Sequence, residues 1–285
     1  INTIRTTLVA CNVSKTTGLR HSSHLASFKE SLIEAKNVVI ISGEDISTES
    51  GLPLYGTDGH WRKYHTSSLA TSGAFLTFPS LVWEFYHHRR EIAARAQPNE
   101  THKAIAQFQR KYGSEKSITV ITQSIDGLHS RAGTKGLIEL HGNLFKTRCI
   151  KCNHVLSNND SPICEALANK GSPDVKDTHS DIPEKLLPHC TSCCGLLRPH
   201  IVWLGESLEP SVIEKAEDAI STCDVCLVVG SASSMFPGAI YVSEAVNRGA
   251  LVAEFNPTPS DKVQFHYFFD GPCSKTVPEA LDLES

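Results

Sequence analysis

The sequence predicts a doubly wound parallel α/β sheet that carries an inserted smaller domain. Three observations support this fold class. Six short apolar runs end in glycine or polar residues, helical patterns lie between several of them, and two segments interrupt the alternation. Parallel strands are buried on both faces by crossover helices and therefore read as continuous apolar runs, as these six segments do.

The strand and helix patterns suggest where a ligand would bind. The helical patterns include SVIEKAEDAISTC and AIYVSEAVNRG, and Gly249 closes the second as a helix C-cap should. Ligands of such sheets bind beyond the carboxyl ends of the strands, so the polar residues after the apolar runs are site candidates. The apolar runs are NVVIISG, SITVITQSIDG, LIELHGN, RPHIVWLGE, DVCLVVGSASS and ALVAEFNP. The candidates after them are residues 43–47, 123–126, 141–143, 230–234 and 256.

The chain divides into a Rossmann-like part and a smaller domain, with an N-terminal stretch outside both. We expect residues 30–60, 113–145 and 198–285 to form the Rossmann-like part. A helical module at 61–112 and a zinc-ribbon module at 146–197 would form the smaller domain.

Residues 1–29 are basic, rich in Ser and Thr, and free of acidic residues. This composition is typical of a mitochondrial presequence, and a disordered basic tail is the alternative interpretation. We therefore expect a location in the mitochondrial matrix, with the cytoplasm and nucleus left open.

Charge and hydropathy exclude two classes of partner. The net charge is −4, the pI is near 6.4, and no run of Lys and Arg resembles a nucleic-acid-binding stripe. No apolar run approaches the roughly 18 to 20 residues that span a bilayer. We expect neither nucleic acid nor membrane as a partner.

Four of the ten cysteines form two Cys-x-x-Cys pairs, Cys149 with Cys152 and Cys190 with Cys193. Two such pairs are typical of a structural zinc site, because each turn presents two thiolates to one tetrahedral ion. Cys194 is a spare ligand that could replace Cys193. Redox or incidental cysteines are the alternative.

Seven segments of the chain match one known family in order and spacing. They are SGEDISTESGLP, TQSIDGLH, ELHGN, the two cysteine pairs, RPHIVWLGE, LVVGSASS and AEFN. Through them the chain resembles the sirtuins, the NAD-dependent protein-lysine deacylases, from about Phe28 to the C-terminus. The resemblance implies NAD and one structural zinc ion as cofactors, and acyl-lysine proteins or peptides as substrates.

The resemblance also implies a mechanism. In sirtuins the acyl oxygen attacks C1′ of the nicotinamide ribose, nicotinamide leaves, and a histidine helps a ribose hydroxyl attack the imidate, giving lysine and O-acyl-ADP-ribose. His141 matches that general base, and an imidazole suits the role near neutral pH. A hydrogen-bonded structural histidine is the alternative. The implied cofactor-binding residues are Gly43, Glu44, Asp45, Ile46, Ser47, Gln123, Ser124, Ile125, Asp126, Gly230, Ser231, Ala232, Asn256, Pro257, Thr258 and Cys273.

The segment WEFYHHRRE addresses acyl specificity. In a helix Tyr86 and Arg89 lie on one face, and an arginine fork beside a tyrosine hydroxyl suits an acyl chain that ends in a carboxylate. The pair resembles that of the sirtuin-5 type, which removes succinyl, malonyl and glutaryl groups; a solvated basic helix face is the alternative. We expect the peptide to add as a strand beside VWLGE. The implied substrate-binding residues are Tyr86, Arg89, Val202, Leu204, Gly205 and Glu206.

The chain departs from the sirtuin pattern in four places along the sequence. GEDIS at 43–47 replaces Gly-Ala-Gly-Ile-Ser, and each new carboxylate would oppose a pyrophosphate by on the order of 1 kcal/mol or more. PLYG lacks the family's Arg, with Tyr55 in place of Phe and Gly56 where the Arg is expected. Ser124 replaces Asn, and Leu204 replaces an aromatic residue.

Three functional hypotheses follow. The first is an NAD-dependent lysine deacylase for succinyl, malonyl or glutaryl groups. The second is an acyl-lysine binding module of the same fold with an impaired NAD site and little turnover. The third and weakest is an ADP-ribosyltransferase on the same scaffold.

Overall fold

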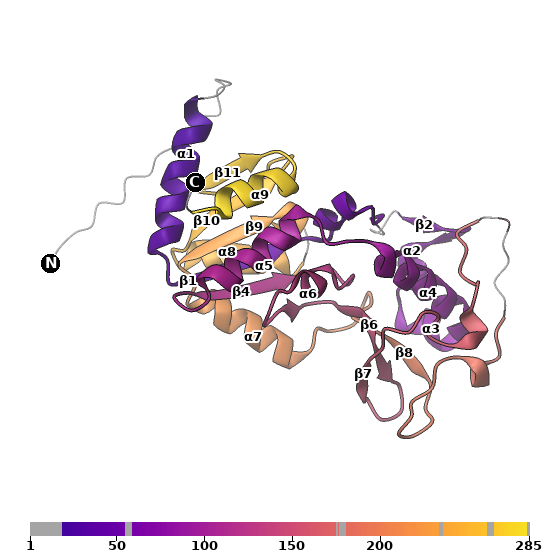
Figure 1. Cartoon of the computed structure of the whole chain (residues 1–285). Helices are drawn as coiled ribbons and strands as arrows, with labels where there is room; N and C mark the ends of the chain where they lie inside the picture. The colour runs from indigo at the N-terminus through magenta and orange to yellow at the C-terminus, as the bar shows by residue number, and fades with distance from the viewer. Residues whose placement is uncertain are drawn as a thin grey trace.

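A six-stranded parallel sheet forms the centre of the larger part of the molecule, with the strand order β11-β10-β9-β1-β4-β5 (Figure 1). All of its pairings are parallel. The computed structural model describes residues 19–54, 59–174, 176, 181–233, 236–260 and 265–283. The strands are β1 (Asn37–Ser42), β4 (Ser117–Thr122), β5 (Ile138–Glu139), β9 (Val225–Val229), β10 (Leu251–Asn256) and β11 (Tyr267–Asp270).

Helices cover both faces of this sheet, which confirms the doubly wound prediction. Along β1, Val38 and Ile40 face the helices of one side, and Val39 and Ile41 face those of the other. The first side holds α1 (Leu19–Glu34), α5 (Glu100–Tyr112) and α9 (Cys273–Leu281), and the second holds α7 (Pro210–Ser221) and α8 (Gly238–Asn247). The fully apolar strand sequence follows from this two-sided burial.

The smaller part lies at one end of the sheet and has its own core (Figure 1). An antiparallel sheet of order β7-β6-β8 packs against α4, whose buried side chains Trp83 and Phe85 contribute to that core. Trp83 Nε1 donates to the carbonyl of Leu197, which fixes the helix to the sheet. The elements are β2 (His60–Trp61), β3 (Tyr64–His65), α2 (Thr66–Leu69), α3 (Ser72–Thr77), α4 (Pro79–Arg95), β6 (Gly142–Cys149), β7 (Val155–Ser157), η2 (Glu165–Leu167), η3 (Glu184–Leu186) and β8 (Leu197–Ile201).

One predicted strand belongs to a different sheet. The start of the run RPHIVWLGE belongs to β8 (Leu197–Ile201), which pairs antiparallel with β6 in the smaller part and does not join the parallel sheet. The run LIELHGN is divided between β5 and the start of β6. A short apolar run does not show which strand it pairs with. The sequence therefore cannot distinguish a strand of the parallel sheet from a strand of the smaller antiparallel sheet.

The structure places two helices differently from the expected boundaries. Helix α5 packs on α9, with Ile105 and Phe108 in the core of the larger part, so it does not belong to the smaller domain. Helix α1 begins at Leu19, and its Phe28 is fully buried in that same core. The fold therefore starts before residue 30, and the presequence remains a prediction for residues that precede this helix. No helix among the described residues is long and apolar enough to cross a membrane.

Candidate active site

The predicted cofactor residues gather at the carboxyl edge of the parallel sheet. Strand β1 leads into the 3₁₀ helix η1 (Glu44–Ser50), β4 precedes Gln123, and β9 leads into η4 (Gly230–Ser233). Strands β1 and β9 are neighbours, and the strand order reverses between them. Such a reversal point opens the crevice in which ligands of these sheets bind.

Two glycines line that crevice. A Cβ atom on Gly230 would lie 2.3 Å from Asp45 Oδ1, and one on Gly43 would lie 2.9 Å from the backbone nitrogen of Ala232. The backbone N–H of Ser231 points into the space, where the Asp45 carboxylate accepts its hydrogen bond at 2.8 Å. The crevice therefore has the two properties that a pyrophosphate requires, which are a donor N–H and walls without side chains.

Four further predicted cofactor residues lie at the end of β10 and at the start of α9. Asn256 ends β10 and is followed by the exposed Pro257 and Thr258. Cys273 begins α9, where its buried Sγ donates to the carbonyl of Phe255 at 3.3 Å. Burial raises the pKa of Cys273 to about 12, with further contributions from nearby carboxylates. This thiol is a packing residue and not a nucleophile.

A small pocket beside this crevice holds the polar residues that follow β4. The Oγ of Ser124 donates to Asp126 Oδ2 at 2.5 Å, and Leu128 N donates to Asp126 Oδ1 at 2.8 Å. The hydroxyl of Ser124 therefore fixes the carboxylate of Asp126 by a hydrogen bond. The pocket is lined by Glu44, Ser47, Leu52, Pro53, Leu54, Arg89, Ile92, Ala93, Ser124, Ile125, Asp126 and Leu144.

A cavity of about 770 Å³ adjoins that pocket and holds the predicted base together with the predicted substrate residues. Glu44, Arg89 and Ile125 line both spaces, so the two meet at these three side chains. Its lining is Glu44, Thr66, Ser67, Ala70, Phe85, Tyr86, Arg89, Gln123, Ile125, His141, Ile201, Val202, Trp203, Leu204, Gly205, Glu206, Ser207, Leu208, Ile213 and Phe236.

His141 lies between β5 and β6 with its ring held in one orientation. Its Nδ1 is 3.1 Å from the carbonyl oxygen of Gln123, and a carbonyl can only accept, so the proton is on Nδ1. Gly142 has a φ of +83°, and a Cβ there would lie 2.0 Å from the His200 oxygen, so only glycine fits after the histidine. Burial lowers the pKa of His141, although the hydrogen bond to Gln123 opposes this. The ring is neutral near pH 7, and Nε2 can accept a proton.

Tyr86 and Arg89 face the same cavity from α4, as the helical spacing predicts. The hydroxyl of Tyr86 accepts a hydrogen bond from Trp203 Nε1 at 2.8 Å, which leaves its own O–H able to donate. Burial raises the pKa of Tyr86, so that proton is retained. The Arg89 guanidinium carbon lies 5.7 Å from the Tyr86 ring centre. The pair presents a neutral donor beside a cation.

The segment after β8 forms another wall of the cavity. Leu204 is 54% exposed, and its N–H donates to the carbonyl of Ala70 at 3.0 Å. Glu206 forms an ion pair with Arg198. Burial opposes ionisation of Glu206, but hydrogen bonds from Arg198, Ser72 and the Trp203 N–H outweigh it and lower its pKa to about 2. Glu206 fixes the loop and is not a proton donor.

Sequence reasoning missed several residues of the cavity. The sequence assigns no role to Trp203 in the VWLGE segment. In the structure its Nε1 donates to the Tyr86 hydroxyl and holds that side chain in place. Thr66, Ser67 and Ala70 line the cavity from α2 and the residue after it, in a region without a recognisable pattern. Tyr55 and Gly56, which belong to one of the four departures from the sirtuin pattern, lie outside the described residues.

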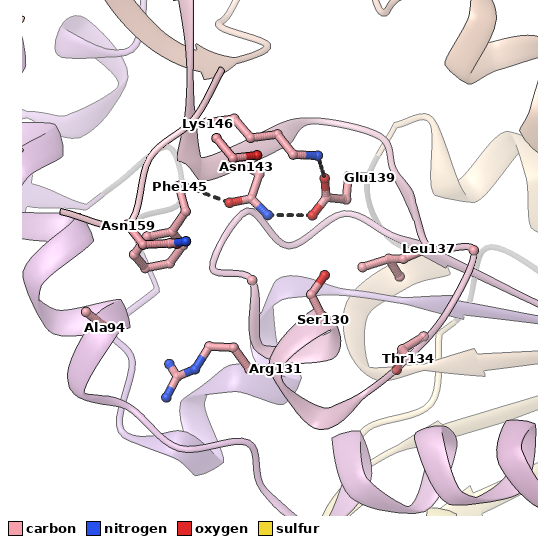
Figure 2. Close-up of a pocket in the computed structure, with 13 residues that line it drawn as sticks. Ala94, Ser130, Arg131, Thr134, Leu137, Glu139, Asn143, Phe145, Lys146 and Asn159 are labelled. Carbon is pink, nitrogen blue, oxygen red and sulfur yellow. Dashed lines mark hydrogen bonds and ion pairs between the residues drawn. The ribbon is translucent and has the colours of Figure 1, made fainter. Parts of the chain in front are cut away.

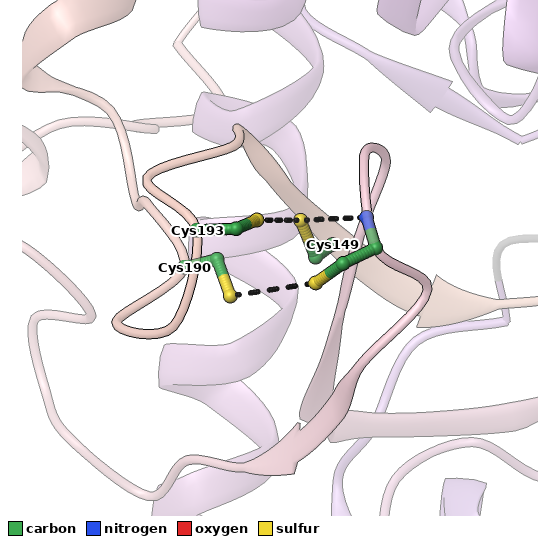
Figure 3. Close-up of side chains that lie close together, drawn as sticks. Cys149, Cys190 and Cys193 are labelled. Carbon is green, nitrogen blue, oxygen red and sulfur yellow. Dashed lines mark hydrogen bonds between the residues drawn. The ribbon is translucent and has the colours of Figure 1, made fainter.

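The four predicted zinc ligands come together. Cys149, Cys152, Cys190 and Cys193 place their sulfur atoms within 4.8 Å of one another (Figure 3). The Sγ atoms of Cys149 and Cys193 are 3.4 Å apart, and those of Cys152 and Cys190 are 3.8 Å apart. Four bonds of about 2.3 Å in a tetrahedron give sulfur separations of roughly 3.8 Å, so the cluster fits one zinc ion. Cys194 is exposed and lies outside the cluster.

A second large cavity, of about 800 Å³, is lined by one strand-end candidate, Asn143, and by none of the residues that the resemblance assigns to the base, the cofactor or the substrate. Figure 2 shows the Asn143 amide and the Lys146 ammonium both directed at Glu139, at 2.5 and 2.7 Å, with Arg131 on the opposite wall. Asn143 is a strand-end candidate, but it lines this cavity and not the one that His141 lines, and its amide donates to Glu139. The cavity lined by His141 is therefore the candidate active site.

The fold and this site define an α/β protein of the dinucleotide-binding class, with an adjoining cavity beside a histidine. The family model described as "Sir2 family" matches residues 43–237, more than half of the chain, and the chain belongs to this family. It is 48% identical over 268 residues to "NAD-dependent protein deacylase sirtuin-5, mitochondrial" of Canis lupus familiaris, covering 92% of this chain and 86% of that protein.

Solved structures resemble the chain as well. One is the crystal structure of a Sir2 homolog–NAD complex, with a TM-score of 0.74 and 32% identity, which covers 90% of this chain and 92% of that one. Another is Sir2 bound to acetylated peptide, with a TM-score of 0.72 and 26% identity over 90% of this chain and 97% of that one.

Proposed function

We propose that this protein is an NAD-dependent protein-lysine deacylase that removes succinyl, malonyl or glutaryl groups. One observation carries the proposal: Tyr86 and Arg89 line the same cavity as His141. A base and a carboxylate-binding pair in one space match the removal of an acyl chain that ends in an anion. The names of the similar proteins support the deacylase class.

Different groups of cofactor residues along the sheet edge would bind different parts of NAD. Gly43, Gly230 and Ser231 would hold the pyrophosphate, Ser124 to Asp126 the nicotinamide side, and Asn256 with Cys273 the adenosine side. When bound, NAD supplies the ribose carbon that receives the acyl oxygen.

His141 acts as the general base in this proposal. Because Gln123 holds the proton on Nδ1, the lone pair of Nε2 is available to take a proton from a hydroxyl. The lowered pKa keeps the ring in its neutral form at neutral pH. Gln123 is therefore a positioning residue that acts through the histidine.

Arg89 would bind the terminal carboxylate of the acyl chain, and Tyr86 would donate to it. A guanidinium presents N–H donors in a planar fork that matches a carboxylate. The buried aromatic side chains of Phe85, Tyr86 and Trp203 line the cavity beside Arg89, and a low local dielectric strengthens such a contact. The acyl-lysine chain would reach the pair along the apolar wall of Val202 and Ile201.

The partners and location follow the same family assignment. Substrates would be acyl-lysine proteins or peptides, and the similar structure with acetylated peptide supports this class. The peptide would lie along the segment from Val202 to Glu206, which lines the cavity. The similar Canis protein is named mitochondrial, and we propose the same location for this one.

A second function is favoured by one specific contact. The Asp45 carboxylate binds the Ser231 N–H that a pyrophosphate would use. If this contact cannot be displaced, the protein is a sirtuin-fold module that binds acyl-lysine without turnover.

Product analysis by mass spectrometry separates these functions. Purified, zinc-loaded protein is incubated with a succinyl-lysine peptide, with and without NAD. NAD-dependent formation of O-succinyl-ADP-ribose and nicotinamide supports the deacylase. ADP-ribose attached to protein would instead indicate a transferase, and no turnover by folded protein would make the binding module the better account.

A further inference from the structure

The carboxylate of Asp45 occupies the crevice in which the strand order reverses. Strand β1 begins the half β1-β4-β5, strand β9 begins the half β9-β10-β11, and the two are neighbours. Both carboxylate oxygens of Asp45 lie within hydrogen-bond distance of the Ser231 N–H, at 2.8 and 2.9 Å. A side-chain anion therefore fills the position that a ligand anion would take.

The walls of the crevice are shaped around this anion. Cβ atoms on Gly43 and Gly230 would lie 2.8 and 2.3 Å from Asp45 Oδ1, distances that no real contact allows. Both glycines leave room for oxygen atoms beside the backbone, and in this structure the oxygens belong to Asp45. A pyrophosphate and this carboxylate cannot occupy that space together.

Glu44, the residue before Asp45, lines the same two spaces as Arg89, the residue proposed to bind the acyl carboxylate. It is partly buried and lines both the small pocket and the large cavity, as Arg89 does. Burial raises the pKa of Glu44, and the attraction of Arg89 opposes that increase, so the two side chains interact electrostatically. Arg89, which would bind the acyl carboxylate, therefore already interacts with the carboxylate of Glu44.

The short helix η1 is anchored in this position from outside the crevice. Asn99, the N-cap of α5, donates through Nδ2 to the carbonyl of Ile46 at 2.7 Å and to Ser50 Oγ at 3.0 Å. Gly43 N donates to Val229 O at 2.9 Å on the other side. These contacts hold the loop so that its two acidic side chains point inward.

We propose that Glu44 and Asp45 form an internal competitor for the anionic groups of both substrates. Asp45 competes with the cofactor pyrophosphate for the Ser231 N–H, and Glu44 competes with the acyl carboxylate for Arg89. The inference rests on the proposed function. Cofactor affinity is reduced by the work of displacing Asp45, and acidic acyl chains bind less tightly than Arg89 alone would allow.

Titration with ADP-ribose tests the Asp45 contact without any catalysis. ADP-ribose carries the pyrophosphate but neither nicotinamide nor an acyl group. Isothermal titration compares the wild-type protein with Asp45→Ala, Asp45→Asn and the control Glu30→Ala, which removes one exposed negative charge on α1. We expect Asp45→Ala to bind at least about tenfold more tightly, because one charge-assisted hydrogen bond is no longer broken on binding. Asp45→Asn gives a smaller gain, and Glu30→Ala gives none.

The outcomes separate this inference from the proposed function. Equal or weaker binding by Asp45→Ala, with wild-type binding intact, overturns the competition and leaves the deacylase standing. Absence of ADP-ribose binding in the wild-type protein and in every folded variant overturns both. If Asp45→Ala does not fold, the affinity of Asp45→Asn decides by the same comparison.

The Glu44 contact has its own test. Titration with a succinyl-lysine peptide compares the wild-type protein with Glu44→Gln, and the same peptide with acetyl-lysine is the control. We expect a gain of at least about fivefold for the succinyl peptide alone, since removing a neighbouring like charge favours a partly buried anion. An equal gain for both peptides, or none for the succinyl peptide, overturns the assignment of Glu44.

Discussion

His141 and Gln123 are joined by a hydrogen bond of 3.1 Å between the ring Nδ1 and the main-chain carbonyl. The bond connects His141, between β5 and β6, to the residue after β4, so the ends of neighbouring strands fix the tautomer of the ring. Since the acceptor is a carbonyl, no change in side chain at position 123 removes it. The orientation of the base is therefore built into the backbone.

The pH dependence of turnover should reflect this burial. The pKa of His141 is lowered, so the neutral base persists below the ordinary value near 6.5. We expect the acidic limb of kcat/KM for a succinyl peptide to have its midpoint below pH 6.5. The variant His141→Asn should lose at least about 100-fold in kcat, as expected for a lost general base, and keep its zinc. A midpoint above pH 7, or full activity of the variant, would contradict the assigned role.

Replacing Arg89 should change specificity more than activity. In Arg89→Met the acyl carboxylate loses its cation, and we expect kcat/KM for a succinyl peptide to fall at least about tenfold further than for the acetyl peptide. Arg95→Met is the matched control, because Arg95 is an exposed arginine in the last turn of the same helix. Equal losses for both peptides in Arg89→Met would remove Arg89 from acyl recognition.

Zinc binding should depend on the four clustered cysteines and not on the nearby Cys194. Cys149→Ser should lose the metal and lower the stability of the β6–β8 sheet, because Cys149 is a fully buried member of the cluster. Cys194→Ser should keep about one zinc per chain, since its thiol is exposed and outside the cluster. Elemental analysis of the purified variants checks this, and metal retained by Cys149→Ser would contradict the site.

The smaller part contains a buried ion pair that should be costly to break. Arg62 Nη2 and Glu84 Oε2 are 3.0 Å apart, and the two side chains are 3% and 0% exposed. Glu84→Ala leaves a buried guanidinium without its carboxylate and should reduce the free energy of unfolding by about 3 kcal/mol. The exposed pair of Lys103 and Glu100 is the control, and Lys103→Ala should cost less than about 1 kcal/mol. Urea denaturation compares the two, and equal effects would contradict the prediction.

Two buried histidines under the active site should make stability depend on pH. The rings of His102 and His129 are 4.8 Å apart, and His129 Nε2 contacts Ser42 Oγ at 2.9 Å. Burial lowers the pKa of His102 to about 4 and that of His129 to about 3. The unfolded chain takes up protons below pH 6.5 while the folded protein does not, so stability decreases from pH 6.5 towards pH 4.

Urea denaturation at pH 7.5 and 5.5 measures this effect. Each histidine should contribute a loss on the order of 1 kcal/mol between these values. The difference should shrink in His129→Asn and persist in His65→Asn, because His65 is exposed. A pH difference that is unchanged in His129→Asn would show that this pair is not its source.

The sequence predicted the parallel sheet because its strands are apolar on both faces. Val38 to Ile41 form a run without polar interruption, and that run alone indicates burial between two helical layers. The position of β8 could not be predicted, since an apolar run does not show whether its partner lies in one sheet or another. The sequence does not predict helix α1, because the basic, acid-free composition of residues 1–29 indicates a presequence or a tail, and this stretch includes the buried Phe28.

The candidate site could be predicted from local patterns, but its internal contacts could not. The spacing of Tyr86 and Arg89 predicted a shared helix face, and the structure confirms that both line one cavity. The sequence also predicts that the charges of Glu44 and Asp45 are unfavourable to a phosphate. The hydrogen bond from the Ser231 N–H to Asp45 joins two loops that are distant in the sequence. No local pattern therefore predicts it.

The most direct test of the account is the specificity of the wild-type protein for one peptide carrying either succinyl-lysine or acetyl-lysine. Initial rates with saturating NAD give kcat/KM for each form. The account predicts that the succinyl form is preferred by at least about tenfold, because Arg89 and Tyr86 would bind its carboxylate. NAD-dependent turnover with equal rates, or with a preference for the acetyl form, would contradict the central claim.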